Sequence, residues 1–413
     1  MENSVNQSLL DFTPKKRGSS SFATSINLCN TVVGAGVLTL ANAMMNAGAG
    51  TGLVLLSFVC ILASASFIFL ASCCDLTGEY SYKSFGAKAF GTKYGKYMEA
   101  FVFLYTSGTA IGYNVLIGDF LPDITKKVLP STAPSFLFSR TWLILLIAVI
   151  VLLPLTYLPR VKRTPIHLWR GSSLYFTDSF PIPSPDIREP VVWWKFNHDI
   201  FLAIPLMSVS YTAHYNVPNL YKELDRPSVK KFTMVVIMGS TFCLLLFASI
   251  GTFGYLSFRN LTEGDLLNNY GQHDNLAFAG KVGLAFTIAF SFPLCMFALR
   301  RSVENIFFAE TKEVWKRQFV LATLLTSAAV SVAILEERIE VILRFSGSTA
   351  GSMIVYVLPA LFYIRISKKH NSGSSVKRFL AYINVVMGFV FMVFCTWNAW
   401  KKLSISLLKL AYI

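Results

Sequence analysis

Long stretches without a charged side chain are the feature of this sequence that most constrains its fold. A helix needs about 20 apolar residues to cross about 30 Å of hydrocarbon. Seven charge-free stretches meet or approach that length: 22–45, 51–74, 141–159, 232–258, 318–335, 345–364 and 379–400. Backbone amides in lipid must be satisfied within the protein, which an α-helix does by itself. These stretches therefore predict membrane-spanning helices.

Three further stretches are apolar but carry an ionisable side chain. Residues 97–121 hold Glu99 and Asp119 near their ends, residues 200–216 contain His214, and residues 276–299 include Lys281 near their start. We interpret Glu99, Asp119 and Lys281 as interfacial anchors, because ionisable groups near helix ends can reach the headgroups. The sequence thus predicts an all-α polytopic membrane protein with ten clear transmembrane helices.

The composition excludes several other classes of protein. Hydrophobic residues make up 54% of the chain and charged residues 14%, and the net charge of +15 comes largely from short loops, so a lipid partner fits better than nucleic acid. All seven cysteines lie in or beside apolar stretches, which favours small core residues over disulfides or metal ligands. We find no nucleophile or metal-spaced cluster typical of an enzyme, and no charged ring or carbonyl filter typical of a channel.

Loop charge predicts the orientation and exposes one inconsistency. Lys and Arg are retained on the cytoplasmic side, which places the N-terminal tail (1–21) inside and the acidic loops around Glu263 and Glu336 outside. Both halves of the chain obey this rule only if the chain crosses the membrane once more within 160–198. That segment is proline-rich and holds no apolar run of spanning length. Either the fifth helix is absent or this segment is re-entrant within protein.

The boundaries of the predicted organisation follow from these observations. Helices 1–4 occupy 22–159, an atypical Pro-rich loop at 160–198 replaces helix 5, helices 6–11 occupy 199–402, and 403–413 form a C-terminal tail.

Two spans contain residues that interrupt a helix. The first has Gly34, Ala35 and Gly36 in mid-membrane, where an unwound turn would expose backbone groups and helix-terminal partial charges suited to a zwitterion. The alternative is a small-residue packing face. The sixth holds Pro205 and a polar run at 208–212. Two interrupted helices in corresponding places indicate the central site of a transporter.

Three other positions are candidates for ion coupling or modification. His214 titrates near neutral pH and could couple protons, or it could simply reach the interface. Thr287 and Ser291 share a helix face and could help to hold a sodium-sized cation, although hydroxyls often bond back to their own helix. Asn260 begins an Asn-Leu-Thr sequon in a predicted outside loop and is a potential glycosylation acceptor.

Several blocks of residues, taken in order, resemble one known family. They are Ser21 to Leu28 with Asn30 to Leu38, Gly112-Tyr113 with Gly118 to Pro122, Ala213 to Asn216 with Tyr221 to Leu224, Phe253 to Leu256, Ser291-Phe292-Pro293 with Ala298 to Arg300, and Gly347 to Gly351 with Leu358 to Tyr363. The chain resembles the amino acid/auxin permeases of the amino acid-polyamine-organocation superfamily. Within that family it is most similar to the sodium-coupled neutral amino acid transporters and the vacuolar amino acid transporters.

The resemblance implies a fold of two inverted five-helix repeats plus one extra helix, and secondary transport by symport or antiport. It implies an amino acid substrate bound by Asn30, Gly34, Ala35 and Gly36 on one side and by Ser208, Val209, Ser210 and Tyr211 on the other. Asn30 would then join Thr287 or Ser291 at a Na⁺ site, whereas H⁺ is the coupling ion common in the vacuolar branch. No cofactor is implied, and the membrane would be the plasma membrane or a vacuolar or lysosomal one.

The chain departs from the family pattern in two places. Ala41 stands where the family usually has proline, and the fifth helix is missing. The second departure keeps an alternative open: a non-transporting amino acid sensor, or a defective or truncated isoform. As a transporter, the chain should lose uptake when a bulky residue replaces Gly36.

Overall fold

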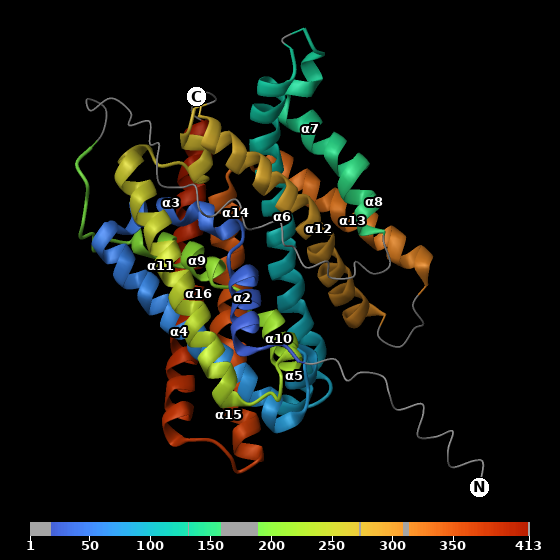
Figure 1. Cartoon of the computed structure of the whole chain (residues 1–413), viewed down its shortest axis with the longest axis vertical. Helices are drawn as coiled ribbons and strands as arrows, with labels where there is room; N and C mark the ends of the chain where they lie inside the picture. Colours follow the sequence, from blue (N-terminus) through green and yellow to red (C-terminus); the bar gives the residue numbers. More distant parts are fainter. Residues whose placement is uncertain (1–17, 131, 158–188, 272–273, 309–313, 412–413) are drawn as a thin grey trace.

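The structure of the chain is a computed structural model that describes residues 18–130, 132–157, 189–271, 274–308 and 314–411 (Figure 1). Within these residues all regular elements are helical, apart from one isolated backbone bridge between Ser19 and Leu224. Most of the predicted N-terminal tail (1–21) and of the Pro-rich loop (160–198) lies outside the described residues. The absence of the fifth helix therefore stays a prediction.

Seven helical segments are long and apolar enough to cross a membrane. They are α4 (Ala49–Thr77), α6 (Tyr94–Val128), Val229–Leu261 with α11 (Val229–Phe258), α12 (Asn275–Phe307), α13 (Trp315–Leu335), Ile339–Lys369 with α14 (Ile339–Ser346) and α15 (Leu358–Lys369), and Ser375–Ile405 within α16 (Ser375–Ala411). The chain is thus an integral, multi-pass membrane protein.

The remaining predicted spans take other forms. The first predicted span consists of two helical segments separated by a bend: α2 (Ser21–Val32), and then η1 (Ala35–Thr39) continuing into α3 (Leu40–Ala47). Together they are long and apolar enough to count as one span, which raises the number of candidate spans among the described residues to eight. The fourth appears as the shorter apolar segment Arg140–Thr156, with α7 (Arg140–Ile147) and α8 (Leu153–Thr156). The sixth contains only α9 (Ile200–Ser210) before it breaks. Ten full spans and the inverted repeats therefore stay predictions.

Polar caps and glycine turns set the ends of several helices. Side chains of Ser20, Ser228 and Asp274 accept hydrogen bonds from amides in the first turns of α2, α11 and α12, which have no acceptor within their own helix. Gly78 ends α4 in the left-handed conformation. At Gly48, with φ +82°, the chain turns directly from α3 into α4.

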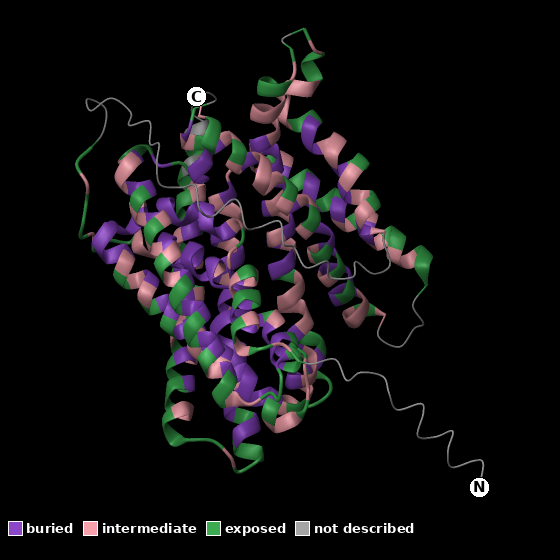
Figure 2. Cartoon of the chain, in the orientation of Figure 1, coloured by how far each residue is buried: buried purple, intermediate pink, exposed green. Residues whose placement is uncertain are grey.

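The central helices of the bundle are the most buried. Helices α3 and α9 pack against each other, α4 packs on α11 and α15, and α6 packs on α12 (Figure 1). Most of Ile339–Lys369 is buried, whereas most residues in the apolar stretches of α12, α13 and α16 are only partly buried or exposed (Figure 2). Large exposed side chains such as Phe242, Phe286 and Phe394 belong in contact with lipid.

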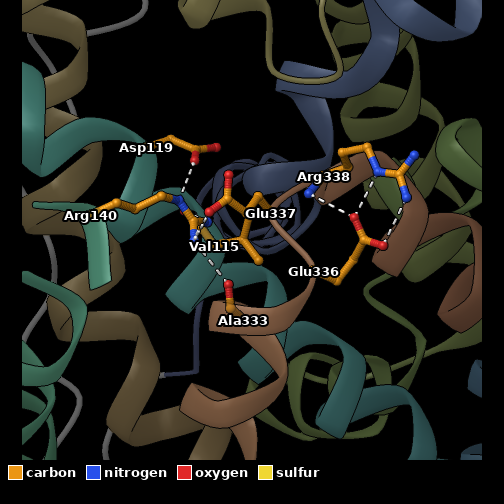
Figure 3. A network of polar contacts seen from close by, with 7 residues as sticks. All are labelled: Val115, Asp119, Arg140, Ala333, Glu336, Glu337 and Arg338. Carbon is orange, nitrogen blue, oxygen red and sulfur yellow. Dashed lines mark hydrogen bonds and ion pairs between the residues drawn. The ribbon is translucent and has the colours of Figure 1, made fainter. Parts of the chain in front are cut away.

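An arginine joins three helices at the acidic end of the bundle (Figure 3). Arg140 at the start of α7 forms an ion pair with Asp119 of α6 at 3.4 Å and donates to the Ala333 carbonyl of α13 at 3.1 Å. It also lies 3.4 Å from Glu337. Asp119 is therefore held in a contact between helices, a pairing that the sequence gave no sign of; its role as an interfacial anchor stays a prediction.

Lys281 and Glu99 are also paired rather than free. The Lys281 ammonium of α12, whose side chain is 5% exposed, forms an ion pair with Asp123 of α6. Glu99 of α6 accepts a hydrogen bond from Ser302 of α12 at 3.1 Å. Polar contacts thus join α6 and α12 near both of their ends.

The described ends of the Pro-rich segment pack at different places. Tyr157, just before the segment, stacks on Phe319 near the start of α13, where Lys316 and Arg317 lie. At the other end, the carbonyls of Val192 and Trp193 accept hydrogen bonds from Ala49 and Gly50 at the start of α4, on the predicted outside. This placement agrees with the change of side that the charge pattern requires of the segment.

A buried carboxyl in the outer loop predicts a pH-dependent stability. Asp265 is 2% exposed, and burial together with the Asp119 and Glu340 carboxylates raises its pKa to about 8, although Lys281 and the Leu267 amide oppose the rise. The folded chain therefore binds this proton between about pH 4 and 8 while the unfolded chain does not.

Because the folded state holds the extra proton, the free energy of unfolding should fall as pH rises across that window. The melting temperature in detergent, measured by tryptophan fluorescence at both ends of the window, should be higher at the acidic end. Asp265→Asn should flatten this dependence. If the melting temperature of the variant still depends on pH to the same extent, groups other than Asp265 are responsible for the dependence.

Candidate functional site

The first span is broken at Val33 and Gly34. Helix α2 ends at Val32, η1 begins at Ala35, and the helices on either side of the break are inclined by 55°. Gly34 is exposed, and no atom lies within 4 Å of the position that a Cβ would take. The chain is thus broken at a glycine, and the space beside Gly34 is open.

The second break lies after α9, at residues 211–213. The chain resumes in η6 (His214–Asn216) and α10 (Val217–Glu223). Pro205 lies within continuous helix, and the interruption comes at the polar run that follows it. The polar run itself ends the helix, since Thr212 donates its hydroxyl proton to the Ser208 carbonyl at 2.8 Å.

The two breaks meet at Gly36 and Ser210. A Cβ on Gly36 would lie 2.9 Å from the Ser210 hydroxyl oxygen and 3.0 Å from its Cα. Only a glycine permits this approach, which brings the start of η1 beside the end of α9. Helix starts carry partial positive charge and helix ends partial negative charge. The junction therefore brings partial charges of both signs close together.

The four predicted residues of the sixth span face different neighbours. Ser210 contacts Gly36, whereas the Ser208 hydroxyl lies 2.8 Å from the Tyr356 hydroxyl. Val209 packs against Gly347. Tyr211 is 1% exposed and packs edge-on against Phe247. Ser210 and the adjacent backbone are thus the part of this set that reaches the junction.

Exposed residues of α2 lead up to the break. Asn27, Asn30 and Gly34 are exposed and fall on one face of the helix at spacings of three and four residues. Asparagines in mid-membrane favour an aqueous path over lipid. This face is on the N-terminal, predicted cytoplasmic side of the break.

The predicted cation ligands are not joined directly. The Thr287 hydroxyl donates to the Gly283 carbonyl of its own helix at 2.9 Å. Helix α12 packs mainly on α6, and α2 mainly on α11. Among the described residues no hydrogen bond joins Asn30 to Thr287 or Ser291. The Na⁺ site stays a prediction.

His214 lies deep in the protein. It is fully buried, and its ring stacks on Phe67 of α4 with centroids 4.3 Å apart. The Ala63 backbone lies nearby, but neither ring nitrogen makes a well-aligned hydrogen bond. A histidine that reached the interface would be solvated, so its burial argues against that alternative. Proton coupling through His214 stays a prediction.

The structure adds residues that the site prediction did not include. Asn216 donates to the Thr31 hydroxyl at 3.2 Å, which joins the segment after the second break to α2. Tyr215 is 40% exposed, and its ring lies 6.5 Å from that of Tyr105 on α6. The only signal for them in the sequence was the Tyr-Asn pair in one block of the family resemblance.

Comparison with known proteins identifies the family. The model of the family described as "Transmembrane amino acid transporter protein" matches residues 17–401. The chain belongs to this family. Proteins of the family are transporters and not enzymes.

Among its relatives, the mouse "Putative sodium-coupled neutral amino acid transporter 11" is 28% identical over 95% of this chain and 87% of its own. The zebrafish protein of that name is 27% identical over 86% and 81%. The zebrafish "Sodium-coupled neutral amino acid symporter 2" is 25% identical over 91% and 81%. Amino acid transport is thus the activity of the family.

The sequon lies in an accessible loop. Asn260 is exposed in η7 (Arg259–Leu261), and its side-chain oxygen accepts a hydrogen bond from the Glu189 amide at 3.3 Å. If this loop is outside, expression in animal cells should attach a glycan there. Treatment with an endoglycosidase should then increase the mobility of the chain on a gel by about one glycan, and Asn260→Gln should abolish that shift. No shift in the unmodified chain would contradict glycosylation at Asn260.

Proposed function

We propose that this chain is a secondary active transporter of neutral amino acids, coupled to Na⁺ or H⁺, that works by alternating access. The contact between Gly36 and Ser210 carries the proposal, because it brings together the free backbone groups of two broken helices. The substrate carboxylate would bind at the start of η1, near Ala35 and Gly36. Its ammonium would bind at the carbonyl end of α2 or α9.

The two ends of the site differ in the way that alternating access requires. On the α2 side, Asn30 and Gly34 are exposed. On the opposite side, Arg344 is buried and donates to Asn42 of α3 at 2.7 Å. This arrangement supports a state open to the predicted cytoplasmic side and closed to the outside.

The coupling ion is proposed from the relatives and from the chain. The names of the mouse and zebrafish relatives say sodium-coupled. For Na⁺, Asn30 with Thr287 or Ser291 are the proposed ligands, and the exposed Asn30 amide favours this choice. For H⁺, His214 is the proposed carrier.

Uptake into proteoliposomes tests the proposal. Purified chain should accumulate radiolabelled neutral L-amino acids above protein-free vesicles, and an imposed Na⁺ or H⁺ gradient should raise the uptake by about 10-fold. The gradient that does so identifies the ion. No uptake under either gradient by folded protein would contradict transport.

The second candidate is an amino acid sensor or a truncated isoform. It is favoured by the lack of an apolar run of spanning length within 160–198. Binding without uptake would support the sensor. A missing apolar segment in the gene at Arg160 would support the isoform.

A further inference from the structure

A cavity of about 250 Å³ lies outward of the junction. It is lined by α3, the start of α14, the end of α16 and the loop that follows α11, and it is partly open. Its lining includes three basic residues, Arg338, Arg344 and Lys402, and two acidic ones, Glu263 and Glu340. Asn42 in the cavity lining is six residues after Gly36, a distance of about 10 Å along η1 and α3.

The buried arginine of this cavity is incompletely paired. Arg344 is 5% exposed, its guanidinium donates to the Asn42 amide oxygen at 2.7 Å, and its Nε makes no hydrogen bond. A guanidinium offers five donors and binds carboxylates in a fork geometry. Arg344 forms no ion pair with any carboxylate among the described residues. A buried cation left this way has strong affinity for an anionic group.

Glu340, the carboxylate that could balance the charge of Arg344, is close in the sequence but unpaired among the described residues. Glu340 lies four residues before Arg344 on α14, a spacing that commonly forms an ion pair. Within the described part of the chain its carboxylate forms no hydrogen bond or ion pair, and it packs over Gly264. Lys402 of α16 likewise contacts only an amide oxygen, that of Asn46, at 3.4 Å.

Arg338 differs from these three residues, because its guanidinium is held by Glu336 at 2.8 Å. The cavity therefore presents basic groups, Arg344 and Lys402, and an acidic group, Glu340, that are separated rather than joined.

We propose that this cavity is a second binding site for a free α-amino acid, with the ligand carboxylate on Arg344 and Lys402 and its ammonium on Glu340. Unpaired charges of both signs in one small space match a zwitterion better than a simple anion. The volume lies just below the range of about 300–1,000 Å³ typical of larger ligands, which favours a small side chain. The site deepens the proposed transport function, since a ligand there would occupy the outer approach to the junction.

Equilibrium binding on the purified full chain tests this site separately from the central one. Radiolabelled L-alanine is the probe, and Gly34→Leu provides a background in which the junction is filled. This variant should keep about half of the bound alanine at saturation. Adding Arg344→Gln should remove the remainder, with an affinity loss of at least about 100-fold. Lys401→Gln is the control, because it also removes one positive charge but from an exposed residue outside the cavity lining. It should leave alanine binding unchanged.

Ligand analogues test the chemistry without a substitution. In the Gly34→Leu background, unlabelled L-alanine should displace the probe, whereas L-alaninamide, which lacks the carboxylate, and propionate, which lacks the ammonium, should each be at least about 30-fold weaker. Equal displacement by propionate or by chloride would overturn the zwitterion site in favour of an anion site. If Arg344→Gln fails to fold, the site is tested instead by the analogues and by Glu340→Gln, which should also weaken alanine binding in the Gly34→Leu background.

The outcomes separate the two proposals. Normal uptake with no alanine bound to Gly34→Leu would refute the outer site and leave the transport function standing. Failed uptake with residual binding that Arg344→Gln removes would refute transport and leave the outer site.

Discussion

Replacing Gly34 by leucine is expected to lower amino acid uptake by at least about 100-fold, which corresponds to about 2.7 kcal/mol. The backbone at Gly34 has φ −132°, which other residues adopt freely, and no atom lies within 4 Å of its Cβ position. The larger side chain therefore enters the open space beside the break without displacing protein atoms. It occupies the space that we assign to the substrate.

Uptake into proteoliposomes and the melting temperature in detergent together check this expectation. Gly34→Leu should melt within a few degrees of the unsubstituted chain. Gly271→Leu is the matched control, because Gly271 also has open space at its Cβ position but lies in the loop between α11 and α12. It should transport normally. Normal uptake by Gly34→Leu would contradict our placement of the substrate.

Gly36 is a less informative position than the sequence suggested. A Cβ there would lie 3.0 Å from the Ser210 Cα, so even alanine requires α9 to shift. Overpacking of this kind typically costs about 1–3 kcal/mol. Loss of uptake in Gly36→Leu would then reflect damaged packing as much as a blocked site, whereas the Gly34 variant separates the two causes.

The sequence predicted the helical fold and the first break because both depend on local composition. Charge-free runs specify helices in lipid, and glycine in mid-span favours unwinding. In the sixth span the helix ends within the polar run that the sequence singled out, whereas Pro205 is accommodated inside α9.

The pairing of charged residues could not be predicted in the same way. Asp123 and Lys281 are 158 positions apart, and Arg140 meets Glu337 across 197. Which of these meet depends on how α6, α7, α12 and α13 pack, and no local pattern encodes that packing. The outer cavity was missed for the same reason, since its lining comes from four separate parts of the chain.

Breaking the ion pair between Asp123 and Lys281 should give the largest loss of stability of any substitution considered. Asp123→Asn leaves the ammonium of a lysine whose side chain is 5% exposed without its carboxylate. An uncompensated buried charge typically costs about 3–5 kcal/mol. Lys281→Met should cost less, because the Asp123 side chain is 27% exposed and can still reach water.

The double variant separates a lost attraction from a stranded charge. Asp123→Asn with Lys281→Met leaves neither charge behind, so its melting temperature should recover most of the loss seen in Asp123→Asn alone. The comparison uses the purified chain in one detergent at one pH. Additive losses in the double variant would show that the two groups act independently and that the ion pair does not hold α6 to α12. Recovery would mean that this contact between the two helices tolerates an uncharged pair, so that the charges are not needed to hold them together.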